Sequence, residues 1–186
     1  MLLCKIKSLS RGFSGISLDL LDRLIYFLQH NLTPVVPEKG SVGASGDLAP
    51  LAHLFLPVIG EGFFWNGNEK IKSKTVLKQH KLKPLDLNAK EGLALINGTH
   101  MMTSIAALAH EDIAIICETA VIATAMSIDA AKATNTFLDD RLHEARGQSG
   151  QRTVAKTILD HLLGSSIIES HMEGDPRVQD PYSFRC

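Results

Sequence analysis

The sequence predicts an all-α protein: a multi-helix bundle with long buried helices and one small β-hairpin excursion. Three observations support this class. Apolar residues recur at helical spacing over 17–30 and over 148–163. The segment from 101 to about 134 is apolar on nearly every side of a helix. Only residues 63–71 carry a strand-like pattern around a tight turn.

The first predicted helix covers about residues 17–30, with Ser17 as its N-cap. Its apolar stripe consists of Leu18, Leu21, Ile25 and Leu28. A loop rich in proline and glycine follows over 33–46, and a short helix is expected over 48–59 with Asp47 in the N-cap position. The loop therefore leads into a helix N-terminus, where the free N–H groups carry a partial positive charge.

The predicted hairpin has its strands at 63–66 and 69–71, joined by an Asn66-Gly67 turn. We expect it on the surface. The lysine-rich segment that follows, 70–83, is interpreted as a solvated face with one or two helical turns.

The second half of the chain is strongly helical, with a break at Asn97-Gly98-Thr99. After the break, the long helix carries one apolar stripe of Ile105, Ala109, Ile113, Ile116, Ala120 and Ala123, and Leu108, Ile115, Ile122 and Met126 cover its other sides. A helix that is apolar all round is buried all round. In a chain of 186 residues we therefore expect part of its surface to be covered by another subunit.

Composition narrows the class of protein. With 45% hydrophobic residues, 21% charged residues and a formal net charge of −1, the chain is expected to be soluble and globular, with no nucleic-acid surface. The three cysteines, Cys4, Cys117 and Cys186, are too far apart for a zinc site or a disulfide framework, which favours the cytoplasm. No signal peptide or membrane span is predicted, although residues 92–109 lack formal charges.

The loop contains Ala44-Ser45-Gly46, within GSVGASGDLAP at 40–50. A nucleophile elbow around Ser45 would need G-x-S-x-G after a buried strand, and here the second glycine comes one place early. A phosphate loop would need a following Lys-Ser/Thr, which is absent. From local spacing alone, an ordinary flexible loop with an N-cap remains an alternative interpretation.

A further reading uses chemistry that only small residues permit. If the Gly46 nitrogen attacks the Ala44 carbonyl and water leaves, the backbone closes into a five-membered ring. Loss of a second water from Ser45 then leaves a conjugated methylene group. Glycine leaves the attacking nitrogen uncrowded, alanine keeps the carbonyl accessible and serine supplies the leaving hydroxyl. The product is an electrophile made from the chain itself.

The sequence resembles the histidine and phenylalanine ammonia-lyase family in four blocks. GSVGASGDLAPLAHL is similar to the family signature in which Ala-Ser-Gly forms 4-methylidene-imidazol-5-one (MIO). Matches in the family's order follow at 11–15 (RGFSG), 90–99 (KEGLALINGT) and 178–186 (VQDPYSFRC). The last block resembles the histidine enzymes more than the plant-type phenylalanine enzymes.

The resemblance assigns roles to individual residues. Ala44, Ser45 and Gly46 would form the MIO autocatalytically, with no metal or external cofactor. Asn97 matches the asparagine beside that group. Arg185 matches the arginine that holds the substrate carboxylate, and Tyr182 and Gln179 match residues that orient the amino acid and the MIO. We expect structural or exposed positions for His53, His100, His110, His143 and His171.

The implied reaction is non-oxidative elimination of ammonia from L-histidine to give urocanate, in a cytoplasmic homotetramer whose active sites combine several subunits. The resemblance also implies that residues 1–186 are the central, MIO-bearing part of a catalytic domain, incomplete at both ends and inactive alone, with the catalytic base outside this chain. Two alternatives stay open: a phenylalanine or tyrosine ammonia-lyase or aminomutase of the same family, and a non-catalytic helical interaction protein derived from it.

Overall fold

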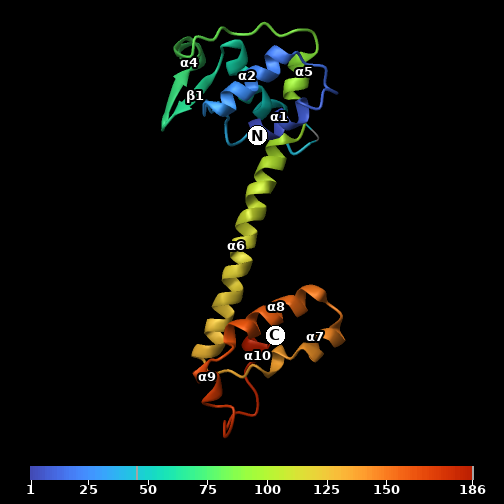
Figure 1. Ribbon diagram of the computed structural model, residues 1–186, viewed down its shortest axis with the longest axis vertical. Coiled ribbons are helices and arrows are strands. Elements are labelled where there is room, and N and C mark those ends of the chain that lie inside the picture. Colours follow the sequence, from blue (N-terminus) through green and yellow to red (C-terminus); the bar gives the residue numbers. More distant parts are fainter. Residues whose placement is uncertain (45, 186) are drawn as a thin grey trace. The chain divides into compact units, whose positions relative to one another are not determined.

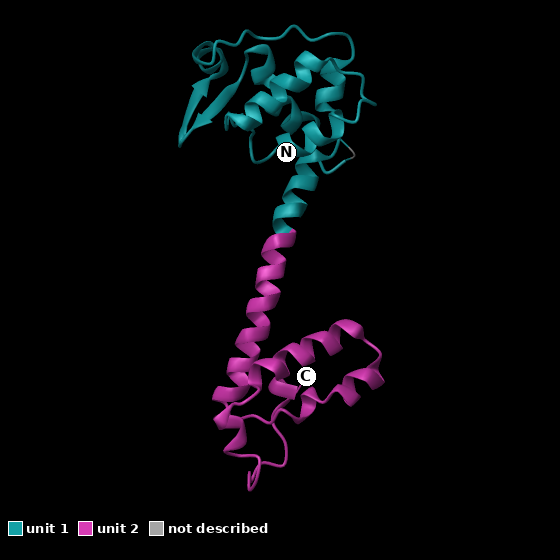
Figure 2. Cartoon of the chain, in the orientation of Figure 1, with its two compact units in different colours: residues 1–109 teal, residues 110–186 magenta. Residues whose placement is uncertain are grey.

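The computed structural model describes residues 1–44 and 46–185, and Figure 1 shows that they are mostly helical. The chain forms two compact units, residues 1–109 and 110–186 (Figure 2). Helix α6, His100–Ala130, contributes to both. The predicted all-α class is confirmed, and so is the hairpin.

Unit 1 (residues 1–109) packs its helices around one apolar core. Its other elements are α1 (Leu2–Leu9), α2 (Leu18–Gln29), α3 (Leu48–Phe55), a 3-10 turn (Leu56–Ile59), β1 (Phe63–Asn66), β2 (Glu69–Lys72), α4 (Ser73–Gln79) and α5 (Glu91–Ile96). Leu24, Leu51 and Val58 lie at the centre of the core and have no exposed surface. The core thus joins α2 to α3 and the turn behind it.

The face of α2 that is buried differs from the predicted one. Ser17 caps the helix as expected, its hydroxyl accepting a hydrogen bond from the Leu20 N–H at 3.3 Å. The buried residues are Leu20, Leu24 and Phe27, whereas Leu18 is 75% exposed. The predicted stripe was wrong at its two ends because α2 is apolar on two adjoining faces, and the packing of the core, which the periodicity does not contain, selects between them.

The hairpin contributes one residue to the core and guides the loop ahead of the Ala-Ser-Gly tripeptide. Phe64 is 1% exposed, and its ring packs edge-to-face against that of Phe27, with the two ring centroids 5.1 Å apart. The Trp65 N–H donates to Thr33 O at 2.9 Å, and the Val35 N–H donates to Phe63 O at 2.8 Å. These bonds set the path of residues 33–35 alongside β1.

Unit 2 (residues 110–186) contains the second part of α6, a 3-10 turn (Thr136–Leu138), α7 (Asp140–Arg146), α8 (Ser149–Leu162), α9 (Ser166–Glu169) and α10 (Tyr182–Arg185). Its core includes Ile128, Leu138 and Ile158. The predicted helix over 148–163 is confirmed as α8, and Gly164 follows it with a φ of 75°.

Helix α6 begins after the predicted break and ends at Ala130, four residues before the expected limit. Within a single chain its middle is uncovered: Leu108 is 71% exposed and Ile116 is 64% exposed. Its buried residues are Met101 near the start and Ala125 and Ile128 near the end. The burial that the sequence predicts for this helix is therefore not supplied by the described residues of its own chain.

Candidate active site

The tripeptide lies in a loop whose two ends are joined by a side-chain hydrogen bond. The Ser41 hydroxyl donates to Asp47 Oδ1 at 2.7 Å and accepts from the Gly43 N–H at 3.2 Å. Ala44 is exposed and Gly46 is half-buried. Ser45, the predicted source of the methylene group, lies outside the described residues. The bond across the base holds residues 41–47 as a closed loop.

Asp47 connects this loop to the break between α5 and α6. As expected, Asp47 occupies the N-cap position of α3, although its carboxylate makes no capping bond to that helix. Instead Oδ2 accepts from the Met101 and Met102 N–H groups at 2.9 and 3.0 Å, so Asp47 caps α6. The Asp47 N–H also donates to Gly98 O at 2.8 Å. The sequence did not indicate this second role, because the partner N–H groups lie more than fifty residues away in sequence.

The carboxylate of Asp47 is ionised within the core. Burial by itself raises its pKa, but the hydrogen bonds from Ser41 and from the Met102 and Met101 N–H groups outweigh that effect and hold the pKa below its usual value. Asp47 has no exposed surface. The negative charge is thus placed at the positive N-terminal end of α6.

Asn97 lies at the C-cap of α5, with extended backbone angles and an exposed side chain. Gly98 follows with a φ of 133°, and a Cβ there would lie 2.5 Å from the His100 ring, so only glycine fits. The Lys5 ammonium of α1 donates to the main-chain carbonyl of Asn97 at 2.6 Å. The structure therefore brings Asp47, at the end of the tripeptide loop, and the break at Asn97-Gly98 to one region of unit 1.

Glu91 fixes the other end of α5. Its carboxylate accepts from the Ser17 N–H at 2.8 Å and from the Asn88 N–H at 2.7 Å. Burial raises the pKa of Glu91, and these hydrogen bonds outweigh burial and lower the pKa below its usual value. A second buried carboxylate, 2% exposed, thus ties α2 and α5 together.

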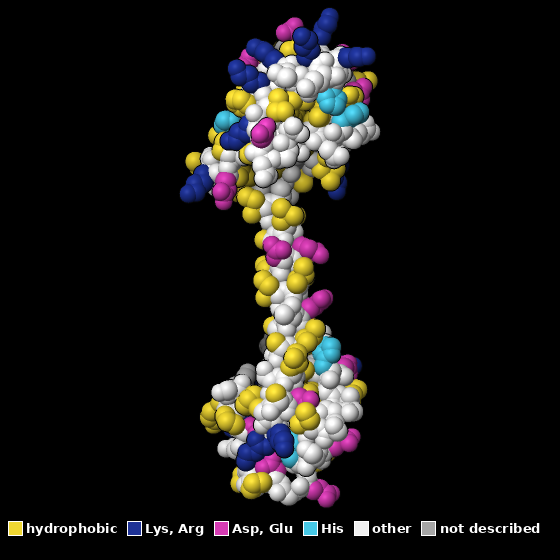
Figure 3. Space-filling view, turned by 90° about the vertical axis from the view of Figure 1, so that its left-hand side faces the viewer, with side chains coloured by type: hydrophobic (Ala, Val, Ile, Leu, Met, Phe, Trp, Pro, Cys, Tyr) yellow, Lys and Arg dark blue, Asp and Glu magenta, His cyan; other side chains and the backbone are white. Residues whose placement is uncertain are grey.

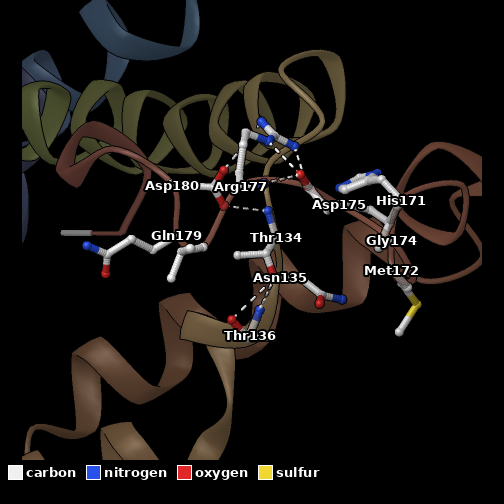
Figure 4. A pocket seen from close by; sticks show the side chains of 12 residues that line it. Thr134, Asn135, Thr136, His171, Met172, Gly174, Asp175, Arg177, Gln179 and Asp180 are labelled. Atoms are coloured by element: carbon white, nitrogen blue, oxygen red, sulfur yellow. Dashed lines mark hydrogen bonds and ion pairs between the residues drawn. The ribbon is translucent and has the colours of Figure 1, made fainter.

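The remaining predicted residues belong to unit 2. Gln179 and Asp180 line a pocket of about 340 Å³, and in Figure 4 the Gln179 amide points away from Arg177. Asp180, which is 4% exposed, accepts from the Thr134 N–H at 2.7 Å and lies 3.5 Å from Arg177. These contacts hold the segment that carries Gln179 against the residues following α6.

Arg185 and Tyr182 lie together on α10. The Arg185 guanidinium lies over the Tyr182 ring at 4.6 Å, and its Nε donates to Asp180 O at 2.6 Å. Its two terminal nitrogens make no hydrogen bond to any residue that the structure describes. They are the donors that a bidentate bond to a carboxylate requires. Tyr182 is 71% exposed.

Lys5 and Glu91 are buried charges that no pattern in the sequence indicated. Both lie within recognised blocks or near them, but a charged residue on a helix is usually solvated, and only the fold shows that these two are not. Among residues 1–44 and 46–185, no group of three or more histidine, cysteine or acidic side chains could hold a metal.

A sequence model of the family described as aromatic amino acid lyase matches residues 1–186, the whole chain. The chain belongs to the aromatic amino acid lyase family. It is 47% identical to the histidine ammonia-lyase of Legionella pneumophila (strain Lens) and 45% identical to that of Idiomarina loihiensis, over all of its length. It spans 37% and 36% of those two proteins.

Solved structures of related proteins share this fold. The match to the histidine ammonia-lyase of Trypanosoma cruzi covers all of this chain and 33% of the Trypanosoma chain, with a TM-score of 0.85 and 35% identity. The match to the phenylalanine aminomutase of Pantoea agglomerans covers all of this chain and 38% of the Pantoea chain, with a TM-score of 0.87 and 32% identity. The same backbone therefore occurs in proteins named for different reactions.

Proposed function

We propose that this chain is the central part of a histidine ammonia-lyase, which eliminates ammonia from L-histidine to give urocanate. The observation that carries this proposal is the loop 41–47, closed by Ser41 and Asp47 and bonded to the segment that carries Asn97. The 47% identity to the Legionella enzyme over the whole chain favours histidine over phenylalanine or tyrosine.

The closed loop suits the formation of an MIO from Ala44, Ser45 and Gly46. Cyclisation requires the Gly46 nitrogen to approach the Ala44 carbonyl, and a loop bonded across its base costs less chain entropy to compress than an open one. A Cβ on Gly46 would touch only Leu48, at 3.5 Å, so the glycine leaves the attacking nitrogen uncrowded rather than avoiding a clash. The residues present therefore fit the group.

Once formed, the ring would supply an electrophilic methylene that draws electrons from the substrate. In the proposed tetramer, side chains from different copies of the chain would bind and orient that substrate. The terminal nitrogens of Arg185, which bond to none of the residues that the structure describes, would hold its carboxylate. The exposed carboxamide of Asn97 would lie beside the ring, and Gln179 and Tyr182 would orient the amino acid. The hydrogen bonds of Asp47 hold the end of the loop against the segment that carries Asn97.

Helix α6 supports assembly into a homotetramer. Figure 3 shows hydrophobic side chains gathered along this helix, with acidic side chains among them. By length and apolar composition the stretch Glu91–Ala130 could also cross a membrane. The acidic residues Glu111, Asp112 and Glu118 in its middle favour a protein partner, because a carboxylate is costly in lipid. We therefore propose that α6 is covered by other copies of the chain, in a cytoplasmic enzyme.

The test is a grafted enzyme, defined as the Legionella histidine ammonia-lyase in which these 186 residues replace the matching stretch. We expect it to convert L-histidine to urocanate, detected by ultraviolet absorbance and mass spectrometry. The matched Ser45→Ala graft, which cannot form the methylene, should be inactive and should lack the loss of two water molecules in its intact mass.

A folded graft that loses both waters yet gives no urocanate would refute the choice of substrate. Cinnamate or coumarate from phenylalanine or tyrosine would then identify an ammonia-lyase of different specificity, and a β-amino acid would identify an aminomutase. A folded graft with its full, unmodified mass would instead favour a non-catalytic descendant of the family.

A further inference from the structure

We propose that Lys5 is a positioning residue, whose buried ammonium fixes the backbone of Asn97 and so aims the Asn97 carboxamide at the tripeptide loop. This inference rests on the proposed function, since it gives Lys5 a task only if Asn97 works beside the MIO. The sequence blocks that indicate the family assign no role to Lys5.

Lys5 is buried to an extent that is unusual for a lysine. Only 2% of the residue is exposed, although α1, on which it lies, is a surface-facing helix that also carries the exposed Lys7. Its ammonium donates to Asn97 O at 2.6 Å, across 92 residues of sequence. No other side-chain hydrogen bond of Lys5 is recorded within the part of the chain that the structure describes. Among the described residues, the side-chain hydrogen bond of this buried charge therefore goes to one carbonyl, that of Asn97.

The carbonyl belongs to a short break that is held from both sides. Asn97 O accepts from Lys5 at the C-terminal end of α5, and Asp47 bonds to Gly98 O through its N–H and to the first N–H groups of α6 through its carboxylate. The cation thus faces the negative end of one helix and the anion faces the positive end of the next. Each charge stabilises the helix end that it faces, and together they leave the backbone of Asn97 and Gly98 little freedom.

A charge is not needed merely to satisfy the carbonyl. A neutral donor or a water molecule would satisfy it, without the desolvation cost of a buried ammonium. That cost is visible in Lys5, because burial lowers its pKa to about 8. A charge-assisted hydrogen bond is shorter and stronger than a neutral one, so it restricts the position of its acceptor more closely. Asn97 is exposed while its main-chain carbonyl is held, so its carboxamide is accessible to a substrate and starts from a fixed backbone position.

The other ionisable groups near Lys5 are few. His100, at the start of α6, has its pKa lowered by burial and then by the charge of Lys5, and Asp47 acts in the opposite direction. The Met1 ammonium acts on His100 in the same sense as Lys5, and in the grafted enzyme it is replaced by a peptide bond. Substitutions at Lys5 in the graft therefore leave His100 and Asp47 as the titratable groups facing this break.

The first measurement follows backbone position without any need for activity. Hydrogen exchange of the amides at 97–102 is compared between the grafted enzyme and its Lys5→Met and Lys7→Met variants. Lys7→Met is the matched control, the same change at an exposed position of the same helix. We expect faster exchange in Lys5→Met only. Equal protection in Lys5→Met and Lys7→Met would overturn the proposal.

The second measurement follows catalysis. A misplaced catalytic group costs up to about 100-fold in rate, so Lys5→Met should lower kcat by about 10- to 100-fold with a smaller change in KM. Lys5→Arg keeps a cation at all pH values used, so it should retain most of the activity and keep it to higher alkaline pH than the unaltered graft. A fall in melting temperature with kcat unchanged would reduce Lys5 to a structural role.

Each remaining outcome separates this inference from the proposed function. An unaltered graft without urocanate, combined with faster exchange in Lys5→Met, refutes the function and keeps the positioning role. Loss of the MIO in Lys5→Met, seen by intact mass, contradicts the inference, because Lys5 would then act on the tripeptide rather than on Asn97. Where Lys5→Met does not fold, Lys5→Arg decides, and an unchanged alkaline limb refutes the proposal.

Discussion

Asp47 is a buried carboxylate whose hydrogen-bond partners come from separate segments of unit 1. Replacing it by alanine leaves the Met101 and Met102 N–H groups without their acceptor and opens the base of the loop at Ser41. We expect Asp47→Ala to lower the free energy of unfolding by about 2–4 kcal/mol, since each orphaned buried donor costs about 1–3 kcal/mol. Urea titration of the chain, followed by fluorescence of its single tryptophan, Trp65, measures this.

The matched control is Asp86→Ala, the same change at an exposed loop position, which should stay within about 0.5 kcal/mol of the unaltered chain. Equal stabilities for the two variants would show that Asp47 makes no net contribution. Intact mass provides a second comparison: the Asp47 variant should form less MIO than the Asp86 variant, because its loop is no longer closed.

At this scale the sequence locates what is chemically unusual and misses what depends on distant contacts. The bare Ala-Ser-Gly tripeptide and the polar break at Asn97 are recognisable from local residues and from the family resemblance. The hydrogen bond from Lys5 to Asn97 and the capping of α6 by Asp47 join segments 92 and 54 residues apart. No local pattern contains such pairs. The position of Asp47 at the N-cap of α3 was predicted correctly, but nothing local indicates that its carboxylate caps α6.

The helices of unit 1 are tied together by two buried carboxylates, which makes their packing sensitive to acid. Asp47 and Glu91 both have pKa values below the usual ones. A carboxyl of this kind contributes its full stability above the pKa that it has in the unfolded chain. The contribution is lost as the pH falls through the lower pKa of the folded state. We therefore expect the stability of unit 1 to fall steeply below about pH 4.

Urea titrations at a series of acidic pH values, with Trp65 fluorescence, measure this dependence. Glu91→Gln removes one of the two titrating groups, so its stability should be lower at neutral pH and should depend less on pH below about 4. Glu173→Gln, at an exposed position of unit 2, is the control and should follow the unaltered chain. A Glu91 variant with the full acid dependence would contradict this assignment.

Element positions follow from periodicity and caps more closely than element faces do. Ser17, Gly60 and Gly164 mark the ends of helices where the sequence places them. The predicted buried face of α2 included Leu18, whereas the structure buries Leu20, because the two residues are equally apolar. Which of them is buried depends on the partners α1, α3 and β1, and these are known only once the fold is known.

For the molecule as a whole, the decisive feature is the surface of α6 that a single chain leaves uncovered. The apolar residues of α6 predict that the helix is buried. The exposed fractions of Leu108 and Ile116 show that the described residues of one chain do not bury it. One sequence does not identify the covering surface, because in the proposed assembly that surface belongs to other copies of the chain. Removing a leucine side chain from water is worth about 1.5–3 kcal/mol, and a tetramer repeats that gain in every copy.

A lysine in this surface tests the assembly. We expect Leu108→Lys to reduce the grafted enzyme from a tetramer to smaller species, because it places an unpaired charge where each copy would bury an apolar side chain. Leu163→Lys is the matched control, since Leu163 is 73% exposed, close to the 71% of Leu108, but lies after α8 rather than on α6. Molar mass from size-exclusion chromatography with light scattering distinguishes the species. A tetrameric, fully active Leu108→Lys enzyme would show that α6 is covered by something other than a second copy of the chain.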